Sequence, residues 1–311
     1  MFILTDHKDW TESLFPDLRP ARVVTTDTID DKVRDIAAMI LGGGTVYKTA
    51  APDIPGGEYF LAAKSAVRSQ YDLLVNLIRN GVKVPPGLIC LADSGQDFHG
   101  LRNRRWQALP GNIHLSLYLS PDCPIPAHGA AFTVLSAVSV IQAIDDIDEL
   151  AGRARTKWVN DVIVERAKVC GVLTHSQAEG NRITAVVLGI GLNVESAPEI
   201  ITDRFVPRTA CLREFLNHPA QINQGRVLGS LLRHLDRNYR LIIDGQYRQL
   251  LDIYRRRSAI IGRNVEIYPD SPLDNISPVI RGRVSRIGDN LELFLDGCDN
   301  PVTRGRLALC V

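Results

Sequence analysis

The chain has 311 residues, of which 45% are hydrophobic, so it can bury a core without disulfide or metal support. It contains 36 lysines and arginines against 35 aspartates and glutamates, which leaves a formal net charge of +1. This balance gives no electrostatic reason to expect a nucleic acid or an anionic membrane as a partner. The length predicts two folding units, a large one and a small one.

The cysteines are scattered, without a Cys-x-x-Cys pair and without histidines at the spacing of a metal site. They are Cys90, Cys123, Cys170, Cys211, Cys298 and Cys310. This pattern predicts reduced thiols and no resident metal. The sequence has no cleavable signal and no apolar run of about 18 residues, the length that spans a bilayer. We therefore expect a soluble, cytoplasmic protein.

Residues 1–60 are the least informative part of the sequence. Residues 31–41 have the apolar spacing of a helix, which a run of three glycines ends. A triple glycine can belong to a phosphate-binding loop, but the Gly-Lys-Ser/Thr that completes such a loop does not follow it. We treat residues 1–60 as an N-terminal extension of unknown role.

The pattern becomes regular from Ser69 onward. Apolar residues recur at helical spacing as far as Ile78, and Asn80 and Gly81 end this helix. Residues 87–92 then predict a buried strand, which a polar, arginine-rich loop follows.

Beyond that loop, residues 112–119 alternate as a strand, and residues 128–144 predict a largely apolar helix buried along one face of a sheet. Strands follow in direct succession over residues 157–164, 168–175 and 182–194, the last two joined by a turn. Meandering strands of this kind favour an α+β sheet over a doubly wound one.

The C-terminal part changes character near residue 260. Residues 224–257 carry two amphipathic helices. From residue 262, short alternating strands separated by glycine-rich and asparagine-rich turns predict a small β domain.

Short blocks in the central strands carry polar residues in fixed places. They are Lys157-Trp158-Val159-Asn160-Asp161, Lys168-Val169-Cys170-Gly171-Val172-Leu173 and Gly189-Ile190-Gly191-Leu192-Asn193-Val194. In this order and spacing they resemble the catalytic core of the biotin protein ligases, in the biotin/lipoate A/B protein ligase family. The resemblance covers residues 65–311 and is most specific over residues 87–194.

The resemblance implies a fold and a division of the chain. Residues 61–258 are expected to form a class II synthetase-like catalytic domain, a mixed sheet with helices on one face. Residues 259–311 are expected to form a small SH3-like β-barrel.

It also implies an activity, in which biotin and ATP give biotinyl-AMP and the biotin is then transferred to a lysine of a biotin carboxyl carrier domain. Magnesium would accompany ATP as counter-ion. No nucleic acid partner is expected, since no convincing N-terminal helix-turn-helix is found. No membrane partner is expected either. Edge strands in this fold allow a homodimer.

The resemblance assigns roles in activation of the acid. A carboxylate that attacks a phosphate needs a fixed cation beside the junction, and Lys157 matches the family residue with that role. Asn160 and Asp161 match residues that organise the nucleotide, and Asn193 matches one near adenine or ribose. The alternatives are a surface lysine at a strand end and a purely structural strand.

Gly171 and Lys168 match family residues that contact the acid. Glycine lets a flat ligand approach the backbone of a strand, although a bulge or hairpin can also require it. Lys168 would contact the ligand carboxylate or phosphate, with a surface role as the alternative. Val159 stands where the family usually has proline.

The arginine-rich loop departs from the family pattern, Gly-Arg-Gly-Arg-x-Gly-Arg-x-Trp, of a lid over the adenylate. Alignment on Trp106 places Gly100, Arg102 and Arg104 on family positions, but His99 and Leu101 stand where arginines are expected. We predict that Arg102 and Arg104 act on the phosphate, or else belong to a solvated basic turn. The altered lid predicts slower chemistry, a leakier adenylate or a different acyl group.

Further substrate contacts are predicted at the borders of the lid. Gln96, Gly100, Trp106 and Asn112 occupy family-like places there. The family's Ser-Thr-Asn at the first core helix is absent, and Ser69 and Gln70 stand in that stretch as weak substitutes.

Other functions remain open on the sequence alone. A lipoate or octanoate ligase has the same fold, but the Arg-Arg-x-x-Gly-Gly-Gly block of lipoate ligases is absent. An octanoyl transferase would need a nucleophilic cysteine, for which Cys170 is the candidate. The remaining alternative is a non-catalytic biotin-binding relative that kept the pocket and lost the lid.

Overall fold

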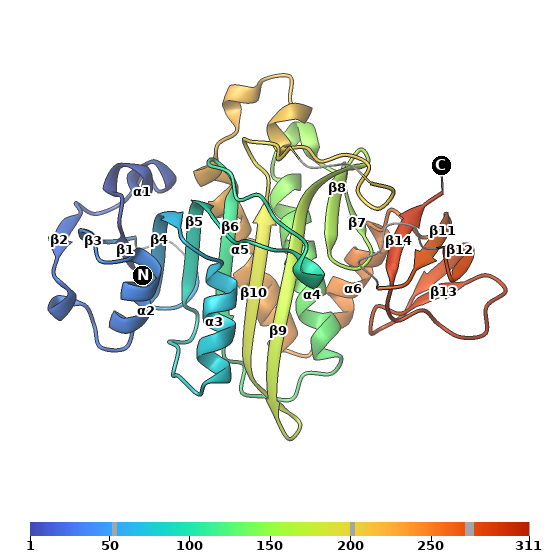
Figure 1. Cartoon of the computed structure of the whole chain (residues 1–311), viewed down its shortest axis with the longest axis horizontal. Coiled ribbons are helices and arrows are strands. Elements are labelled where there is room, and N and C mark those ends of the chain that lie inside the picture. The colour runs from blue at the N-terminus through green and yellow to red at the C-terminus, as the bar shows by residue number, and fades with distance from the viewer. Residues whose placement is uncertain (52–54, 200–202, 271–276, 311) are drawn as a thin grey trace.

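A computed structural model describes residues 1–51, 55–199, 203–270 and 277–310 of the chain. A ten-stranded mixed sheet forms its frame, in the order β2-β3-β1-β4-β5-β6-β10-β9-β8-β7 (Figure 1). The strands of this sheet are β1 (Phe2–Thr5), β2 (Arg22–Val24), β3 (Val46–Ala50), β4 (Tyr59–Ala66), β5 (Ile89–Gly95), β6 (Ile113–Leu119), β7 (Ala154–Lys157), β8 (Asp161–Val164), β9 (Ala167–Glu179) and β10 (Arg182–Leu192).

Helices connect these strands, together with short 3₁₀ turns. The helices are α1 (Lys8–Leu14), α2 (Arg34–Leu41), α3 (Gln70–Arg79), α4 (His128–Asp145), α5 (Gln224–Ile243) and α6 (Tyr247–Arg256). The 3₁₀ turns are η1 (Thr26–Thr28), η2 (Leu101–Asn103), η3 (Asp148–Leu150), η4 (Leu212–Phe215) and η5 (Pro219–Gln221).

The first 60 residues extend the main sheet. Strand β1 pairs in parallel with β4 and antiparallel with β3, which in turn pairs with β2. Helix α1 packs against α5 at Gly225, where a Cβ atom would lie 2.5 Å from the carbonyl oxygen of Leu14. The extension is therefore joined to the core by backbone hydrogen bonds and by close packing.

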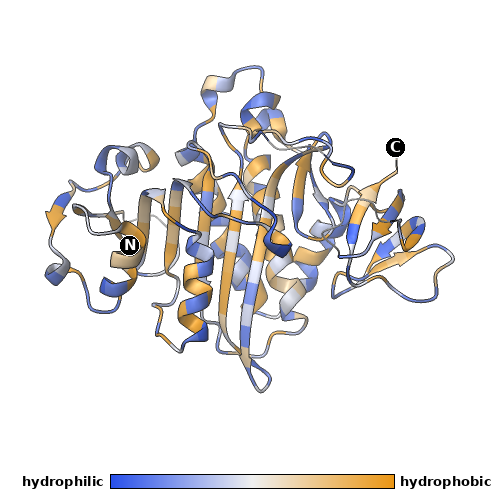
Figure 2. Ribbon diagram, viewed as in Figure 1, coloured by the Kyte–Doolittle hydropathy of each residue, from blue (hydrophilic) through white to orange (hydrophobic). Residues whose placement is uncertain are grey.

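Helices cover both faces of the sheet, so the expectation of helices on one face is wrong. Residues of α4 and α5 share one core with Phe60 of β4, whereas residues of α2 and α3 share a second core with Leu61. Successive residues of a strand point to opposite faces, so strands buried on both sides must be apolar along their length. The central strands β4 to β6 are largely hydrophobic (Figure 2).

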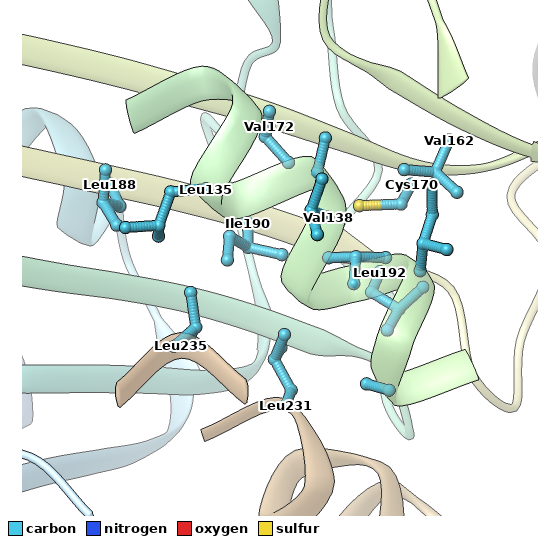
Figure 3. Packing of buried hydrophobic residues seen from close by; sticks show 14 of the residues in the cluster. Leu135, Val138, Val162, Cys170, Val172, Leu188, Ile190, Leu192, Leu231 and Leu235 are labelled. Atoms are coloured by element: carbon cyan, nitrogen blue, oxygen red, sulfur yellow. The ribbon is translucent and has the colours of Figure 1, made fainter. Parts of the chain in front are cut away.

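The larger core lies between the sheet and helices α4 and α5. Leu135 and Val138 of α4 lie near Leu188 and Ile190 of β10 (Figure 3), and Leu235 of α5 belongs to the same cluster. By length and composition α4 is apolar enough to cross a membrane, but 78% of it is buried inside the structure. It is the core helix that the sequence predicted.

The predicted strand over residues 157–164 is in fact a tight hairpin. Strand β7 ends at Lys157, and β8 begins at Asp161, which is its partner in the antiparallel register. Apolar and polar residues alternate both before and after the turn. The pattern therefore resembles one continuous strand, and the prediction of a single strand was wrong. The predicted strands at 168–175 and 182–194 and the two helices of 224–257 are confirmed, as β9, β10, α5 and α6.

A second, four-stranded antiparallel sheet follows α6 in the order β13-β12-β11-β14. Its strands are β11 (Asn264–Tyr268), β12 (Ile280–Ile287), β13 (Leu293–Leu295) and β14 (Arg306–Leu309). The indole N–H of Trp158 donates to the carbonyl of Leu291 at 2.6 Å, and Tyr247 of α6 donates to that of Asp289 at 2.8 Å. These bonds fasten the small sheet to the main one.

Candidate active site

A cavity lies on the face of the sheet opposite α4, over strands β6, β9 and β10. Ser69 and Tyr71 at the start of α3 form one wall. The loop between β5 and β6 forms another, and we call its residues 96–107 the lid loop. Because strand side chains alternate, Gly189 and Gly191 face the cavity, whereas Ile190 between them points its side chain into the α4 core.

The floor of the cavity is made of glycines on which aromatic rings lie. A Cβ atom on Gly191 would come within 2.6 Å of the Trp106 indole, and one on Gly189 within 2.9 Å of the Tyr71 ring. A side chain at either position would therefore force the aromatic ring to shift. A Cβ atom on Gly171 would make ordinary contacts, 3.4 Å from Nζ of Lys168 and 3.6 Å from Trp106. The protein's own side chains leave space over Gly171.

His114 of β6 holds the Trp106 ring in place. The indole N–H donates to Nδ1 of His114 at 3.3 Å, and Nε2 of His114 lies 3.2 Å from the carbonyl oxygen of Leu109. Burial lowers the pKa of His114 to about 4, because the charged ring would lose its hydration. A neutral ring with its proton on Nε2 satisfies both hydrogen bonds.

Two lysines and one carboxylate meet beside this cavity. Nζ of Lys168 lies 2.6 Å from Oδ1 of Asp161, an ion pair by distance whose orientation is not that of a directed hydrogen bond. Lys157 is 8% exposed, and its ammonium group donates to the carbonyl of Phe205. Burial lowers the pKa of Lys157, and the positive charges of Lys168 and Arg104 act in the same direction. The cluster has an excess of positive charge, which favours an anionic ligand.

The hairpin between Lys157 and Asp161 divides its side chains between two surroundings. Asn160 lines the cavity, and its amide donates to the carbonyl of Val172 at 2.8 Å, which fixes the hairpin to β9. Trp158 points instead toward the small sheet and bonds to Leu291. It does not line the cavity. The peptide bond between Trp158 and Val159 is cis.

Asn193 borders a second hollow, which shares the lining residues Gly100, Trp106 and Lys168 with the first. The Asn193 side chain is 1% exposed and donates to the carbonyl of Ala210 at 3.1 Å. Its Oδ1 atom accepts no hydrogen bond within the described parts of the chain. It is a buried acceptor with unused capacity beside a hollow, a feature that suits a donor group of a ligand.

The arginines of the lid loop point in different directions. Arg102 lies 2.9 Å from Asp270 and donates to the carbonyl of Gly305 at 3.3 Å, so it binds the small sheet. Arg104 donates to the carbonyl of Leu101 at 3.1 Å and lines the second hollow. Of the two arginines assigned to phosphate, only Arg104 therefore borders a hollow beside Lys168.

Several other predicted residues lie outside the main cavity. Gln96 borders an open hollow on the outer side of the lid loop. Asn112 is fully buried, and its Oδ1 accepts from the amides of Val194, Glu195 and Ser196 at 2.8, 3.1 and 3.1 Å. Asn112 thus fixes the chain after β10. Gln70 is 2% exposed and faces the interior.

The cavity brings together a subset of the sequence-predicted residues. These are Ser69, Gly100, Trp106, Asn160, Lys168 and Gly171. Ser69 also caps α3, since its Oγ accepts from the amide of Asp72 at 3.3 Å. Lys157, Asp161, Asn193 and Arg104 lie beside them, around the ion pair and the second hollow.

Sequence reasoning missed other residues that line the cavity. They are Tyr71, Phe98, His114 and Ser116. For His114 and Ser116 a signal exists, because both interrupt the apolar residues of β6 at alternate positions and so face the same side. For Tyr71 and Phe98 only the tertiary structure identifies the role.

Comparison with known proteins agrees with this geometry. Residues 81–193 match the model of the biotin/lipoate A/B protein ligase family. The bifunctional ligase/repressor BirA of Bacillus subtilis is 32% identical over 158 residues, which are 50% of this chain and 47% of that protein. The biotin--[acetyl-CoA-carboxylase] ligase of Mycobacterium tuberculosis is 30% identical over 192 residues, 58% of this chain and 64% of that protein.

Among solved structures, the biotin protein ligase from Aquifex aeolicus in complex with biotin and ATP superposes with a TM-score of 0.60 and 18% identity. That match covers 81% of this chain and 98% of the other, and it shows the shared fold. The chain spans about half of the length of the BirA protein that it matches, 47%. The sequence blocks, the fold and these matches make this chain similar to the biotin protein ligases, and its residues 81–193 match the biotin/lipoate A/B protein ligase family.

Proposed function

We propose that this protein is a biotin protein ligase, which forms biotinyl-AMP from biotin and ATP and transfers the biotin to a lysine of a carrier domain. The observation that carries the proposal is the buried cluster of Lys157, Lys168 and Asp161, whose member Lys168 lines two neighbouring hollows. One hollow has a glycine and aromatic floor for a flat acid, and the other has an unused amide oxygen and an arginine for a nucleotide.

The proposed first step joins the biotin carboxylate to the α-phosphate of ATP, with loss of pyrophosphate. Two anions must approach each other, and negative charge builds up on the phosphorus centre and on the leaving group. Lys168, at the border between the two hollows, is placed to offset this charge, and Lys157 adds a second cation behind it. In the second step the amine of a carrier lysine attacks the acyl carbon and AMP leaves.

We assign the nucleotide to the second hollow. Asn193 would accept from a donor of the base or ribose, Arg104 would contact phosphate, and Asn160 and Asp161 would order the junction. Magnesium would enter with ATP as its counter-ion. Asp161, the carboxylate of the cluster, is already paired with Lys168, so we assign the metal mainly to the ATP phosphates.

The remaining assignments follow from the same proposal. Residues 61–258 would be the catalytic domain, residues 259–311 an SH3-like domain, and residues 1–60 an extension built into the sheet of the catalytic domain. We propose a biotin carboxyl carrier domain as partner, no nucleic acid or membrane partner, a cytoplasmic location, and a homodimer as the oligomer to test. The substrate contacts of Gln96, Asn112, Gln70 and Arg102 remain predictions.

One structural observation weighs against acyl transfer through a cysteine. Cys170 is fully buried in the α4 core, and this burial raises the pKa of its thiol well above the ordinary value. Its neighbour in the strand, Gly171, points to the opposite face of the sheet, where the cavity lies. A thiol that is neutral and turned away from the ligand is a poor nucleophile.

A different observation favours the non-catalytic alternative. Arg102, which matches a phosphate-binding arginine of the family, is paired with Asp270 on the small sheet. A lid whose arginine is held there would contribute less charge to the adenylate. Binding of biotin without turnover is therefore the second candidate function.

The experiment incubates the full chain with ATP and, in parallel, biotin, lipoate or octanoate, and measures pyrophosphate release and acyl-adenylate. Calorimetry of each acid without ATP measures binding alone. We expect adenylate with biotin, reduced at least about 100-fold in Lys168→Met, the scale of losing one electrostatic contact to the transition state. The exposed Lys83→Met is the matched control.

Each alternative has its own outcome in this experiment. Adenylate with octanoate or lipoate but not with biotin would assign the same site to another acid. Tight biotin binding without pyrophosphate release would favour the non-catalytic relative. No binding and no adenylate with any of the acids would reject the proposal.

A further inference from the structure

A histidine of the lid loop is bound to a carboxylate of helix α3. Nε2 of His99 lies 2.8 and 2.9 Å from the two carboxylate oxygens of Asp72, and Nδ1 lies 3.0 Å from the carbonyl oxygen of Gly100. Both ring nitrogens thus face oxygen acceptors. An imidazolium donates from both nitrogens, whereas a neutral ring donates from only one. The arrangement therefore suits the protonated ring.

The lid loop around His99 is a small hairpin, so that fixing one residue fixes the others. The amide of Gly100 donates to the carbonyl of Arg104 at 2.7 Å, and that of Trp106 donates to the carbonyl of Phe98 at 2.9 Å. Phe98, Gly100 and Trp106 all line the cavity. The contact of His99 with Asp72 of α3 consequently sets the position of this wall of the cavity.

The charged surroundings of His99 are simple among the described residues. Helix α3 contributes Asp72 and, next to it, Tyr71, whose pKa is raised to about 12 by burial, so that it is neutral. The lid loop contributes Arg104 and Arg105, the latter paired with His99 through the backbone. Strand β6 contributes His114, whose pKa is lowered to about 4 by burial. Asp72 is the negative charge in contact with the ring.

We propose that Asp72 is a positioning residue, which through protonated His99 holds the lid loop closed over the cavity. For the reaction this inference rests on the proposed function: a closed lid keeps water from the acyl-adenylate until the carrier lysine arrives. Arg102 and Asp270 anchor the tip of the same loop to the small sheet. Trp106 of the loop is also bonded to His114 of β6. Among these contacts of the described residues, the one made by His99 depends on protonation near neutral pH.

The direction of titration follows from the contacts. Burial opposes the charged ring, but the hydrogen bonds to Gly100 and Asp72 outweigh it and raise the pKa of His99 above its ordinary value. The contact is therefore complete below about pH 6.5, the ordinary pKa of histidine, and is lost as the pH rises through the raised pKa. The lid is expected to loosen in mildly alkaline solution.

The test measures hydrogen exchange of the lid-loop amides in the full chain without ligand, corrected for the intrinsic effect of pH. The variants are Asp72→Asn, His99→Gln and the double variant, with Asn76→Ala, an exposed residue one turn further along α3, as control. We expect about five-fold faster exchange in each single variant, the scale of one half-exposed charge-assisted bond. The double variant should be no faster than either single one.

A purely structural role of Asp72 in the first turn of α3 would give a different result. In that case His99→Gln would leave the lid-loop amides protected from exchange, and the effects of the two substitutions on the exchange rate would be additive. His99→Arg should restore protection and remove its dependence on pH, because arginine stays charged. Equal exchange in wild type and His99→Gln, or exchange that does not rise with pH in the wild type, would reject the proposal.

The effect on the reaction is measured separately, as the rate at which preformed biotinyl-adenylate is hydrolysed or released. We expect a faster loss in Asp72→Asn and His99→Gln with little change in formation of the adenylate. If no variant and no wild type forms adenylate while the exchange results hold, the lid contact stands and the proposed function fails.

Discussion

Nζ of Lys168 lies 2.6 Å from Oδ1 of Asp161, and both side chains are largely buried, with 14% and 9% of their surfaces exposed. Lys168 of this pair lines both hollows, the cavity over Gly171 and the one that Asn193 lines. A buried ion pair adds little net stability compared with apolar residues, but removal of one partner leaves a charge without compensation.

Removal of Lys168 is therefore expected to cost stability as well as activity. Lys168→Met should lower the free energy of unfolding by about 3 kcal/mol, because the buried Asp161 would lose its ion-pair partner. The double variant Lys168→Met/Asp161→Asn should recover most of this loss. Urea unfolding measures both.

The exposed pair of Arg182 and Asp122 provides the control, since 53% and 63% of these side chains are exposed. Asp122→Asn should change the free energy of unfolding by less than about 1 kcal/mol. If the double variant of the buried pair is as unstable as Lys168→Met alone, the loss comes from packing and not from the unpaired charge.

The glycines of the cavity floor should respond differently to substitution by alanine. Gly191→Ala places a methyl group 2.6 Å from the Trp106 ring, so the ring must shift, at a cost of about 1 to 3 kcal/mol. At Gly171 the methyl group meets no atom closer than 3.4 Å, and stability should hardly change.

Biotin binding should further distinguish Gly171 from Gly191. If biotin lies against β9 as proposed, Gly171→Ala should weaken biotin binding at least about ten-fold while the protein stays as stable as the wild type. Calorimetry and thermal unfolding of the same samples provide both values. Unchanged affinity in Gly171→Ala would place the ligand elsewhere.

The burial of the His114 ring leads us to expect that the folded protein loses stability in acid. Burial lowers its pKa to about 4, below the value of about 6.5 in an unfolded chain. Between these pH values the unfolded chain binds the extra proton, so stability falls as the pH drops from 6.5 toward 4, by about 3 kcal/mol in all.

The check compares the pH dependence of unfolding in the wild type with that of His114→Gln, which cannot titrate. Other acidic groups affect both proteins alike, so the difference between the two curves belongs to His114. Parallel curves between pH 6.5 and 4 would contradict the assignment of a neutral, buried ring.

The lid arginines should differ in their effect on the reaction. Arg104→Met should reduce adenylate formation by about ten-fold or more, because Arg104 lines the hollow assigned to the nucleotide. Arg102→Met should have a smaller effect, because Asp270 already holds that guanidinium on the small sheet.

Arg79→Met, which removes an exposed arginine that lines neither hollow, is the control. Asp270→Asn releases Arg102 from the small sheet, so this variant should raise and not lower adenylate formation. If adenylate formation falls more in Arg102→Met than in Arg104→Met, Arg102 reaches the phosphate during the reaction and the assignment of roles must be exchanged.

The sequence predicted the central strands well for a local reason. The apolar runs of β5 and β6 and the long apolar helix α4 follow from spacing alone, because burial depends on which residues share a face. The hairpin at Lys157 was taken for a strand, since alternation does not mark where a chain turns. Helices were expected on one face, yet the apolar residues of β4 on both sides already required cover on each.

The amino-acid sequence by itself determined the resemblance to the biotin protein ligases, because the blocks around Lys157, Gly171 and Asn193 are contiguous. Only the tertiary structure decided the partners of those residues. Trp106 lies on Gly191, His99 binds Asp72, and Arg102 binds Asp270. These contacts join segments that are distant along the chain. Their free energy depends on packing in three dimensions, which the spacing of residues along the sequence does not indicate.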